Sequence, residues 1–456
     1  MQIASIHHPA SYRDPSGFIF EKGGIIYRQV NICFKEHFDH FIKSGLYAQL
    51  VEKKMLLPHE EVEENLTADS QYYKCLKPAQ LSFISYPYEW CFEMLKDAAL
   101  LTLQLAKESL NYGMMLKDSP AFNIQWHEGR LIFIDTLSFE KREDGKPWIA
   151  YRQFCEQFLA PLLLMHYSGN PLQELLLAYP EGIPIKTCAS LLPAKSKFSL
   201  YTYLHAHLHS RLSGKKENPG KQHFFSEKKL ENLLKSLEAL INSLHLKENK
   251  SAWSGYYKEV ENRKDYLQQK KQIVESWIDK SKARTAADLG ANEGEFSTLL
   301  GQKNIQTLAA DFDAFCINRL YKRIKSSQEK NVLPLVINLA NPSPSIGVNN
   351  QERNSFIDRT NVDLALALAL IHHLCVGRNI PFDMVAAFFK SVCSTLIIEF
   401  VPKEDEKVKF MLQQKKDIYD WYKEENFVNA FSEYFEVIDK QIISGTQRVL
   451  YLMKKI

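Results

Sequence analysis

The segment Thr285-Ala286-Ala287-Asp288-Leu289-Gly290-Ala291-Asn292-Glu293-Gly294 decides the fold of the C-terminal part of the chain. An apolar strand ends at Asp288, and the chain must then turn back at once into a helix. Gly290 permits the tight turn, and Gly294 would let the backbone approach a ligand without a Cβ in the way. Asn292, a residue type that tolerates the left-handed conformation, stands between the two glycines. The segment predicts a strand, a ligand-binding loop and a helix.

Further strands follow this unit in alternation with helical stretches. They are apolar on both faces, as expected for parallel strands that helices cover on both sides. The last two strands differ, because a turn at Ser444-Gly445-Thr446 joins them as a hairpin. The predicted strands are TAADLG, TLAAD, LPLVINL, VDLALALALI and STLIIEF, followed by the hairpin strands FEVIDKQII and QRVLYLMKK. The pattern predicts an α/β domain with a parallel sheet that ends antiparallel.

Residues 250–456 resemble class I S-adenosylmethionine (SAM)-dependent methyltransferases. In that family an acidic residue precedes GxGxG, and a Rossmann-like sheet of seven strands ends in an antiparallel hairpin. The resemblance implies that SAM is the cofactor and that Asp288 and the loop (Gly290, Asn292 and Gly294) hold its methionine moiety. Dinucleotide-binding enzymes also place an acid after a glycine turn, but the terminal hairpin and the fourth strand favour the methyltransferase.

The resemblance also implies residues for the rest of the cofactor. Asp311, at the end of the second strand, would accept hydrogen bonds from the ribose hydroxyls, with Asp313 as the alternative. Asn338, at the end of the third strand, would read the adenine amino group. Glu399, at the end of the fifth strand, is another acid that could reach the pocket.

The fourth strand leads directly to His372 and His373, where the family places residues beside the transferred methyl group. Imidazole suits deprotonation of a hydroxyl near neutral pH, so both histidines are candidate general bases. Alternatively, one of them caps the next helix and the other packs. The long connection at residues 340–361 is either a lid over the acceptor or a solvated insertion.

A second motif lies in the N-terminal half, in LKDSPAFNIQWHEGRLIFID at residues 116–135. Asp118 is followed five residues later by Asn123, and Asp135 follows a predicted strand. Phosphoryl transfer needs a carboxylate near the attacking hydroxyl, and Asn and Asp oxygens to hold Mg²⁺. Near the start, FIFEKGGIIYRQV predicts two strands joined at Gly23-Gly24, with Arg28 on the second strand.

Residues 15–210 resemble kinase-like folds of the aminoglycoside and lipopolysaccharide kinase types, which are two-lobed α+β domains. The resemblance implies Asp118 as the catalytic carboxylate of an active kinase and Asn123 and Asp135 as Mg²⁺ ligands. It also implies that Asn123, Asp135 and Arg28 bind the nucleotide. ATP with Mg²⁺ is therefore a possible second cofactor. The chain departs from the family at Lys117, which replaces an Arg, and it shows no glycine-rich phosphate loop apart from Gly17. An active kinase, a degenerate module that binds substrate or nucleotide, and an unrelated fold in which Asp118 and Asn123 stabilise a turn all stay open.

Other segments give simpler predictions. Helical patterns cover about residues 34–54, 92–110 and 148–212, and residues 81–90 resemble a strand. Residues 213–222 have the composition of a linker. Beyond them, leucines and isoleucines repeat in steps of three and four, which predicts either a helix packed between domains or a short dimerising coil; the repeat is Leu230, Leu234, Leu237, Ile241 and Leu244.

Composition limits the classes of function. The length of 456 residues suggests two or three domains, and 45% hydrophobic with 24% charged residues is an ordinary globular balance. A net charge of +3 gives no strong sign of nucleic-acid binding. The eight cysteines are scattered, which fits neither a zinc site nor a disulfide framework. The sequence shows no signal peptide, and its longest apolar stretch is too short to cross a bilayer. We therefore expect a cytoplasmic protein without a membrane partner.

These observations predict a kinase-like domain at residues 1–212, a linker and connecting helix at 213–249, and a methyltransferase domain at 250–456. The predicted function is SAM-dependent methyl transfer to an unidentified small-molecule or macromolecular acceptor, with the N-terminal domain binding substrate or nucleotide. The alternatives are a nucleotide-dependent phosphotransferase with an auxiliary methyltransferase-fold domain, and a non-catalytic interaction protein. The organisation is also similar to that of methyltransferases linked to nodulation-type host-signal biosynthesis.

Overall fold

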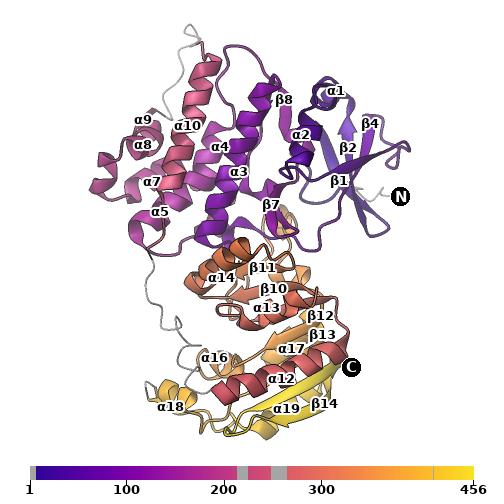
Figure 1. Ribbon diagram of the computed structural model, residues 1–456, viewed down its shortest axis with the longest axis vertical. Coiled ribbons are helices and arrows are strands. Elements are labelled where there is room, and N and C mark those ends of the chain that lie inside the picture. The colour runs from indigo at the N-terminus through magenta and orange to yellow at the C-terminus, as the bar shows by residue number, and fades with distance from the viewer. Residues whose placement is uncertain (1–6, 213–223, 248–263, 414) are drawn as a thin grey trace. The chain divides into compact units, whose positions relative to one another are not determined.

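The chain divides into two compact units, which Figure 1 shows as ribbons. Unit 1 comprises Met1–Glu248 with Ser345–Arg353, and unit 2 comprises Asn249–Pro344 with Asn354–Ile456. The computed structural model describes residues 7–212, 224–247, 264–413 and 415–456. The linker predicted at residues 213–222 lies outside the described residues. Within the described part of the chain, no helix has the length and apolar character needed to cross a membrane.

Unit 1 begins with an antiparallel sheet in the order β1-β2-β4-β3. Its strands are β1 (Gly17–Lys22), β2 (Ile25–Asn31), β3 (His59–Val62) and β4 (Tyr72–Pro78). Gly23 and Gly24 join β1 to β2 with φ values of 63° and 76°, which only glycine adopts without strain. The predicted hairpin is confirmed, and it places Arg28 on β2 opposite Ile19 of β1.

The strand predicted at residues 81–90 is wrong. This segment contains a short 3₁₀ turn at Pro87–Glu89, and local side chains take the place of a strand ladder. Glu89 accepts a hydrogen bond from the backbone N–H of Tyr86 at 2.9 Å, and the Trp90 indole donates to Ser85 at 2.9 Å. These buried polar contacts satisfy the segment without a partner strand. The sequence did not indicate strands β3 and β4, which are too polar to show a clear alternation of apolar residues.

Unit 1 also contains helices. They are α1 (Lys35–Lys43), α2 (Leu46–Glu52), α3 (Phe92–Asn111), α4 (Tyr151–Phe154), α5 (Ala160–Ser168), α6 (Leu175–Ala178), α7 (Ile185–Leu191), α8 (Leu200–Thr202), α9 (His209–Leu212) and α10 (Glu227–Ser243). The helix expected at residues 34–54 is two helices, because Gly45 has a φ of 88° between α1 and α2. The helices predicted at 92–110 and 148–212 are confirmed in outline.

The predicted leucine repeat lies on α10, and it packs inside unit 1 against α3. Lys107 of α3 forms an ion pair with Glu238 of α10 at 2.5 Å, and Lys96 donates to the carbonyl of Leu244 at 2.7 Å. The helix that the sequence placed between the domains is therefore part of the packing of unit 1.

Short strands of unit 1 carry the second sequence motif. They form two antiparallel pairs, β5 (Met114–Leu116) with β8 (Phe139–Lys141), and β6 (Ile124–His127) with β7 (Arg130–Phe133). Glu128 and Gly129 make the turn between β6 and β7, both at positive φ. Asn123 directly precedes β6 and Asp135 follows β7. The β6–β7 hairpin therefore brings Asp135 close to Asn123.

Unit 2 contains a seven-stranded sheet in the order β11-β10-β9-β12-β13-β15-β14. In it, β15 runs antiparallel to both of its neighbours, β13 and β14, while the pairs from β11 to β13 are parallel. The strands are β9 (Thr285–Leu289), β10 (Gln306–Asp311), β11 (Val332–Val336), β12 (Val362–Ala367), β13 (Cys393–Phe400), β14 (Phe435–Ile442) and β15 (Val449–Lys455). All the strands predicted for this half of the chain are confirmed.

Helices cover this sheet. They are α12 (Lys264–Ser281), α13 (Glu295–Gln302), α14 (Ala314–Ser327), α15 (Phe356–Arg359), α16 (Ile371–Cys375), α17 (Phe382–Val392), α18 (Glu406–Leu412) and α19 (Glu424–Ser432). On one face, Trp277 of α12 and Phe296 of α13 are buried against strand residues such as Leu364 and Leu450. Parallel strands that are packed in this way end together at one edge of the sheet, where α/β folds bind ligands.

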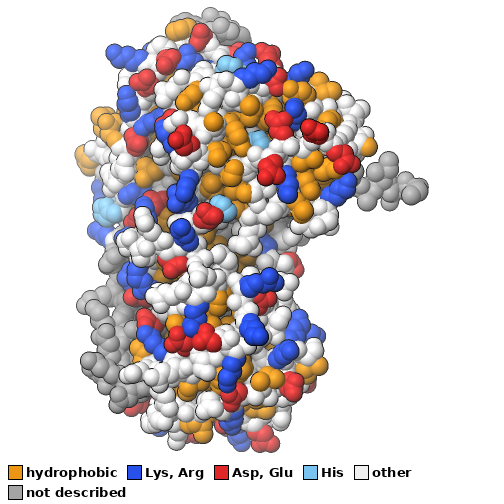
Figure 2. Space-filling view, turned by 45° about the vertical axis from the view of Figure 1, so that its right-hand side comes forward, with side chains coloured by type: hydrophobic (Ala, Val, Ile, Leu, Met, Phe, Trp, Pro, Cys, Tyr) orange, Lys and Arg blue, Asp and Glu red, His pale blue; other side chains and the backbone are white. Residues whose placement is uncertain are grey.

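Charged side chains of both signs are interspersed on the face of the molecule in Figure 2. Ion pairs within each unit include Lys53 with Glu108 at 2.6 Å and Lys303 with Asp279 at 2.7 Å. This mixed distribution agrees with the small net charge of the sequence.

Candidate functional site

A cavity of about 290 Å³ lies at the carboxyl ends of β9, β10, β11 and β12 in unit 2. The predicted cofactor residues Asp288, Gly290, Asn292, Asp311 and Asn338 all line it. They come from three different strand ends, and the parallel order of the strands brings them together. Unit 2 therefore assembles five of the six predicted cofactor residues around one space.

Gly294, the sixth predicted residue, packs against α14 and not against the cavity. It does not line the cavity; a Cβ on it would come within 2.5 Å of the side chain of Leu320 on α14. Its φ of 76° also favours glycine. Glycine at this position therefore lets the start of α13 pack against α14.

Asp288 ends the apolar part of β9 and is only 3% exposed. The Ser297 hydroxyl donates a hydrogen bond to its carboxylate at 2.6 Å. Burial raises the pKa of Asp288 to about 6, because the charged form has lost much of its hydration. A ligand that brings a positive charge or a hydrogen-bond donor to this carboxylate would offset that loss.

Asp311 is the last residue of β10, and it holds the loop with its carboxylate. One carboxylate oxygen accepts from the backbone N–H of Asn292 and the other from that of Asp313, both at 2.8 Å. Burial raises the pKa of Asp311 to about 6 despite these two donors. A carboxylate oxygen can accept a second hydrogen bond, so Asp311 can still bind a pair of hydroxyl groups.

Asp313, the predicted alternative to Asp311, has another role. Its Oδ1 accepts from the backbone N–H groups of Phe315 and Cys316, so this carboxylate caps α14 at its N-terminus. Asp313 does not line the cavity. The geometry therefore favours Asp311 as the acid that faces a ligand.

The loop after β9 is fixed against the neighbouring strand. The backbone N–H groups of Gly290 and Ala291 both donate to the carbonyl of Ala310, at 2.8 and 3.0 Å. Gly290 has a φ of 85°, and Asn292 has a φ of 52°. Asn292 thus adopts the left-handed conformation that the sequence led us to expect of it.

Phe312 is a further cavity residue that no sequence motif indicated. Phe312 follows Asp311, lines the cavity, and exposes 53% of its surface, which is unusual for a large apolar side chain. Asn338 lies near it on the cavity wall, with its side-chain oxygen accepting from the backbone N–H of Ala340 at 3.1 Å. An aromatic ring and an amide placed in this way suit a planar heterocycle such as adenine.

The two histidines lie differently. His373 lines the cavity, whereas His372 is 2% exposed and does not, and its Nδ1 has no hydrogen-bond partner among the described residues. Burial, reinforced by Arg448 and Lys407, lowers the pKa of His373 to about 4. His373 is thus neutral at physiological pH and can accept a proton, while His372 packs inside the unit.

A buried network of charges adjoins the cavity. Glu399 is fully buried and forms an ion pair with Lys270 at 2.5 Å, and Tyr266 donates to it at 2.9 Å. Arg448 contacts Glu399 at 3.4 Å and binds Asp405 at 2.8 and 3.0 Å. Burial alone would raise the pKa of Glu399, but the two cations outweigh it and lower that pKa. Lys270 and Tyr266, but not Glu399, line the cavity.

The connection at residues 340–361 touches this cavity only at its start, since Ala340 lines it. Its middle part, Ser345–Arg353, belongs to unit 1 by its contacts. Within unit 1, Glu352 of this segment pairs with Arg13 at 3.0 Å, and Arg353 lies over the ring of Phe122.

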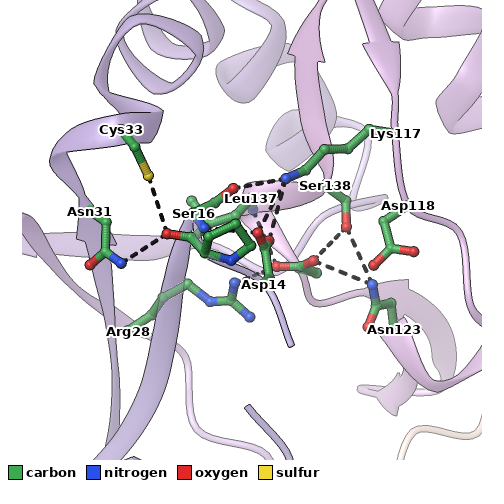
Figure 3. A network of polar contacts seen from close by, with 12 residues as sticks. Asp14, Ser16, Arg28, Asn31, Cys33, Lys117, Asp118, Asn123, Leu137 and Ser138 are labelled. Carbon is green, nitrogen blue, oxygen red and sulfur yellow. Dashed lines mark hydrogen bonds and ion pairs between the residues drawn. The ribbon is translucent and has the colours of Figure 1, made fainter. Parts of the chain in front are cut away.

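In unit 1, the residues of the second motif gather in one polar cluster, part of which Figure 3 shows. The Asn123 amide donates to Asp135 at 3.3 Å, and Arg28 forms an ion pair with Asp135 at 2.5 Å. Ser138 also donates to Asp135, and Asp135 accepts from the backbone N–H of Leu137. Arg28, Asn123 and Asp135 therefore lie together in this cluster.

Asp118 lies at the edge of this cluster. Gln153 donates to its carboxylate at 2.6 Å. Burial raises the pKa of Asp118, and the nearby carboxylates of Asp135 and Asp14 act in the same direction. Asp118 thus lies beside Asn123 of the cluster (Figure 3).

Gly17, the one glycine that we considered for a phosphate loop, lies where β1 packs closely against β2. A Cβ on Gly17 would lie 2.0 Å from the carbonyl oxygen of Gln29, so glycine allows β1 to approach β2. No group of three or more His, Cys, Asp or Glu side chains suited to a metal ion occurs among the described residues.

The strand order of unit 2, its glycine turn after β9 and its two buried acids are consistent with a methyltransferase fold. No protein-family model matches the chain. The chain is 34% identical over 456 residues to nodulation protein NoeA of Rhizobium meliloti (strain 1021), in a match that covers 98% of this chain and 95% of NoeA. The chain belongs to the NoeA family.

Solved structures show more distant similarities. The bifunctional kinase-methyltransferase WbdD aligns with a TM-score of 0.30 at 18% identity, over 43% of this chain and 39% of that one. Magnesium protoporphyrin IX methyltransferase from Synechocystis PCC 6803, with bound SAH, has a TM-score of 0.31 at 14% identity, over 42% and 84%. The N-methyltransferase NodS from Bradyrhizobium japonicum WM9 also has a TM-score of 0.31, at 10% identity, over 42% and 96%. The fold assignment rests on the strand order itself.

Proposed function

We propose that unit 2 is a SAM-dependent methyltransferase. The observation that carries this proposal is the convergence of Asp288, Gly290, Asp311 and Asn338 on one cavity at the carboxyl ends of parallel strands. The two acids are buried with raised pKa values and neutral donors, which is a cost that a cationic, hydroxyl-bearing ligand offsets. The residues present therefore fit SAM.

Each residue has a distinct part in this proposal. Asp311 accepts hydrogen bonds from the ribose hydroxyls, and Phe312 packs on the adenine, whose amino group Asn338 reads. Asp288, next to the turn at Gly290, interacts with the methionine moiety. SAM, when bound, supplies a methyl group on a sulfonium centre, and the transfer is an in-line displacement that depends chiefly on positioning.

His373 is the residue that we propose for the acceptor. It lines the same cavity and is uncharged near neutral pH, so it can take a proton from a hydroxyl or amine as the new bond to the methyl carbon forms. With a pKa of about 4 it is a weak base, and orienting the acceptor by a hydrogen bond is an equal part of its role. The acceptor itself is a small molecule or macromolecule whose class the cavity does not specify.

Calorimetric titration of the full-length chain tests the proposal. We expect SAM and its demethylated product SAH to bind at one site per chain, and Gly290→Val to abolish binding because a branched side chain cannot adopt the left-handed turn. Failure of SAH to bind the folded wild-type chain, or undiminished binding by folded Gly290→Val, would refute it.

For unit 1, we propose a second role as a module that binds a nucleotide or another phosphate-bearing substrate. The observation in its favour is that Asn123, Asp135 and Arg28 meet in one cluster with Asp118 beside them. As these side chains lie, they do not offer an open set of ligands for Mg²⁺, because Arg28 and three hydrogen-bond donors already occupy both oxygens of Asp135. Loss of nucleotide binding in Asp135→Asn, with SAH binding unchanged, is the expected result.

A further inference from the structure

Lys117 precedes Asp118 in unit 1, and its charge is partly compensated by residues that precede β1. Its ammonium lies 2.9 Å from the Ser16 hydroxyl and 3.4 Å from a carboxylate oxygen of Asp14. It also lies 4.6 Å above the ring of Phe34. Asp14 and Ser16 precede β1, about a hundred residues earlier in the chain. The start of unit 1 thus reaches into its polar cluster (Figure 3).

The turn that carries Asp14 is anchored through Pro15. The amide of Asn31 donates to the Pro15 carbonyl at 2.9 Å, and the Cys33 thiol donates to the same oxygen at 3.2 Å. Within the turn, the backbone N–H of Ser16 donates to the Asp14 carboxylate at 2.8 Å. These contacts place the Asp14 carboxylate on the side of the cluster where Lys117 points.

The contact between Asp14 and Lys117 is loose. Its 3.4 Å separation exceeds the 2.7–2.9 Å typical of a tight charge-assisted hydrogen bond. The Lys117 and Asp14 side chains are 19% and 35% exposed, and ion pairs that water can reach contribute little to stability. A ligand with its own negative charge could therefore replace Asp14 at small cost.

The charges of the cluster favour a phosphate as that ligand. Lys117 and Arg28 are an ammonium and a guanidinium, the two side-chain groups that bind phosphates in proteins. Each now lies on a carboxylate of the chain itself, Asp14 and Asp135 respectively. A phosphate entering beside Lys117 would be repelled by Asp14 as long as Asp14 remained in place.

We propose that Lys117 and the Ser16 hydroxyl form a phosphate-binding site, which Asp14 occupies as an internal competitor. Binding of a phosphate-bearing ligand to unit 1 then requires Asp14 to leave Lys117. This inference rests on the nucleotide- or phosphate-binding role proposed for unit 1, and it is independent of methyl transfer in unit 2.

The test measures binding of three probes to the full-length chain by titration calorimetry: the nucleotide analogue AMP-PNP, pyrophosphate, and adenosine. The variants are Asp14→Asn, which removes the competing charge at constant size, Lys117→Met, and the double variant. The matched control is Asp144→Asn, because Asp144 is also paired with a cation of unit 1, Arg142 at 2.7 Å, but is 84% exposed and is not among the charges that affect Asp118. SAH binding to each variant reports the integrity of unit 2.

We expect Asp14→Asn to bind AMP-PNP and pyrophosphate about three- to tenfold more tightly than the wild-type chain, which is up to ~1.4 kcal/mol at tenfold. The gain should disappear in the double variant, and adenosine affinity should not change. An equal gain in Asp144→Asn, a gain that survives Lys117→Met, or a gain for adenosine would overturn the inference. Binding of AMP-PNP by the wild-type chain without any gain in Asp14→Asn would also overturn it, while leaving the phosphate-binding role of unit 1 intact. Absence of phosphate binding in every variant would reject both.

Discussion

Replacement of Asp311 by Asn should separate the ribose-binding role proposed for this residue from its structural role. The Asn side chain keeps the shape of the carboxyl group, and its one carbonyl oxygen can still accept one of the two backbone hydrogen bonds, from Asn292 or Asp313. It loses the charge and one acceptor. Hydrogen bonds to a charged group contribute about 1.5–3 kcal/mol, so we expect SAH to bind roughly 10- to 150-fold more weakly.

The matched control is Asp313→Asn, which lies two residues away. Asp313 caps α14 through one oxygen and does not line the cavity. An Asn cap is about as good as Asp, so this variant should bind SAH like the wild-type chain. Titration calorimetry on both variants, with circular dichroism to confirm folding, makes the comparison. The reverse result, a loss in Asp313→Asn with none in Asp311→Asn, would refute the assignment.

The pH dependence gives a second measurement of the same residue. The pKa of Asp311 is raised to about 6, so its carboxylate becomes protonated as the pH falls through 6 and one acceptor is lost. SAH affinity of the wild-type chain should therefore decline below pH 6, and less steeply in Asp311→Asn. The fold responds with the opposite sign: a raised acid pKa means that the folded state binds protons more tightly, so this residue stabilises the fold at low pH and that contribution is lost as the pH rises through about 6. Asp288, with the same raised pKa, should keep some of the dependence in the variant.

Three further results are expected. Gly290→Ala and Gly445→Ala both place a side chain at positive φ, which costs about 1–2 kcal/mol of folding free energy in each. In a calorimetric titration, only Gly290→Ala should lose SAH affinity. Equal SAH affinities of the two variants would mean that the Gly290 loop is not part of the binding site. His373→Asn should slow methyl transfer with little change in SAH affinity, whereas His372→Asn should mainly lower the melting temperature; the opposite pattern in the two assays would reverse their roles. Glu399→Gln should lower the free energy of unfolding by about 3–5 kcal/mol in denaturant titrations, because it leaves the buried Lys270 without its charge partner, whereas Arg448 keeps Asp405. The pKa of Glu399 is lowered from 4.5, so the stabilisation that Glu399 gives the wild type is present above pH 4.5 and is lost as the pH falls below it. A Glu399→Gln variant as stable as the wild type at pH 7 would contradict this account.

The fold of unit 2 could be predicted from the sequence because its parallel strands are largely buried on both faces. Strands such as Val332–Val336 and Val362–Ala367 appear as continuous apolar runs, and the glycine turn and the terminal hairpin have short-range signals of their own. In unit 1, β3 contains two adjacent glutamates and carries no such signal. The buried aromatic segment at residues 81–90 has the composition of a strand, but side-chain hydrogen bonds satisfy it locally.

The candidate site could be predicted only where its residues belong to a motif. Asp288, Gly290 and Asp311 follow strands at recognisable spacings, so the sequence places them together. Lys270 and Tyr266 come from a helix that precedes the motif, and only the folded chain shows that they line the same cavity. The role of Gly294 depended on the packing of Leu320, which no local pattern reveals.

The two units use the same residue types in opposite electrostatic settings. In unit 2, the acids at the cavity accept hydrogen bonds from neutral donors, such as Ser297 and backbone N–H groups, and burial raises their pKa values to about 6. A ligand that brings a positive charge and hydroxyl donors relieves this cost, so binding is favoured without any prior rearrangement. In unit 1, Asp135 and Asp14 each lie on a cation of their own chain, Arg28 and Lys117. On the proposal made for Lys117, a phosphate-bearing ligand must first displace Asp14, so an acid, an amide and a cation at the spacing of a binding motif do not by themselves make a site ready to bind.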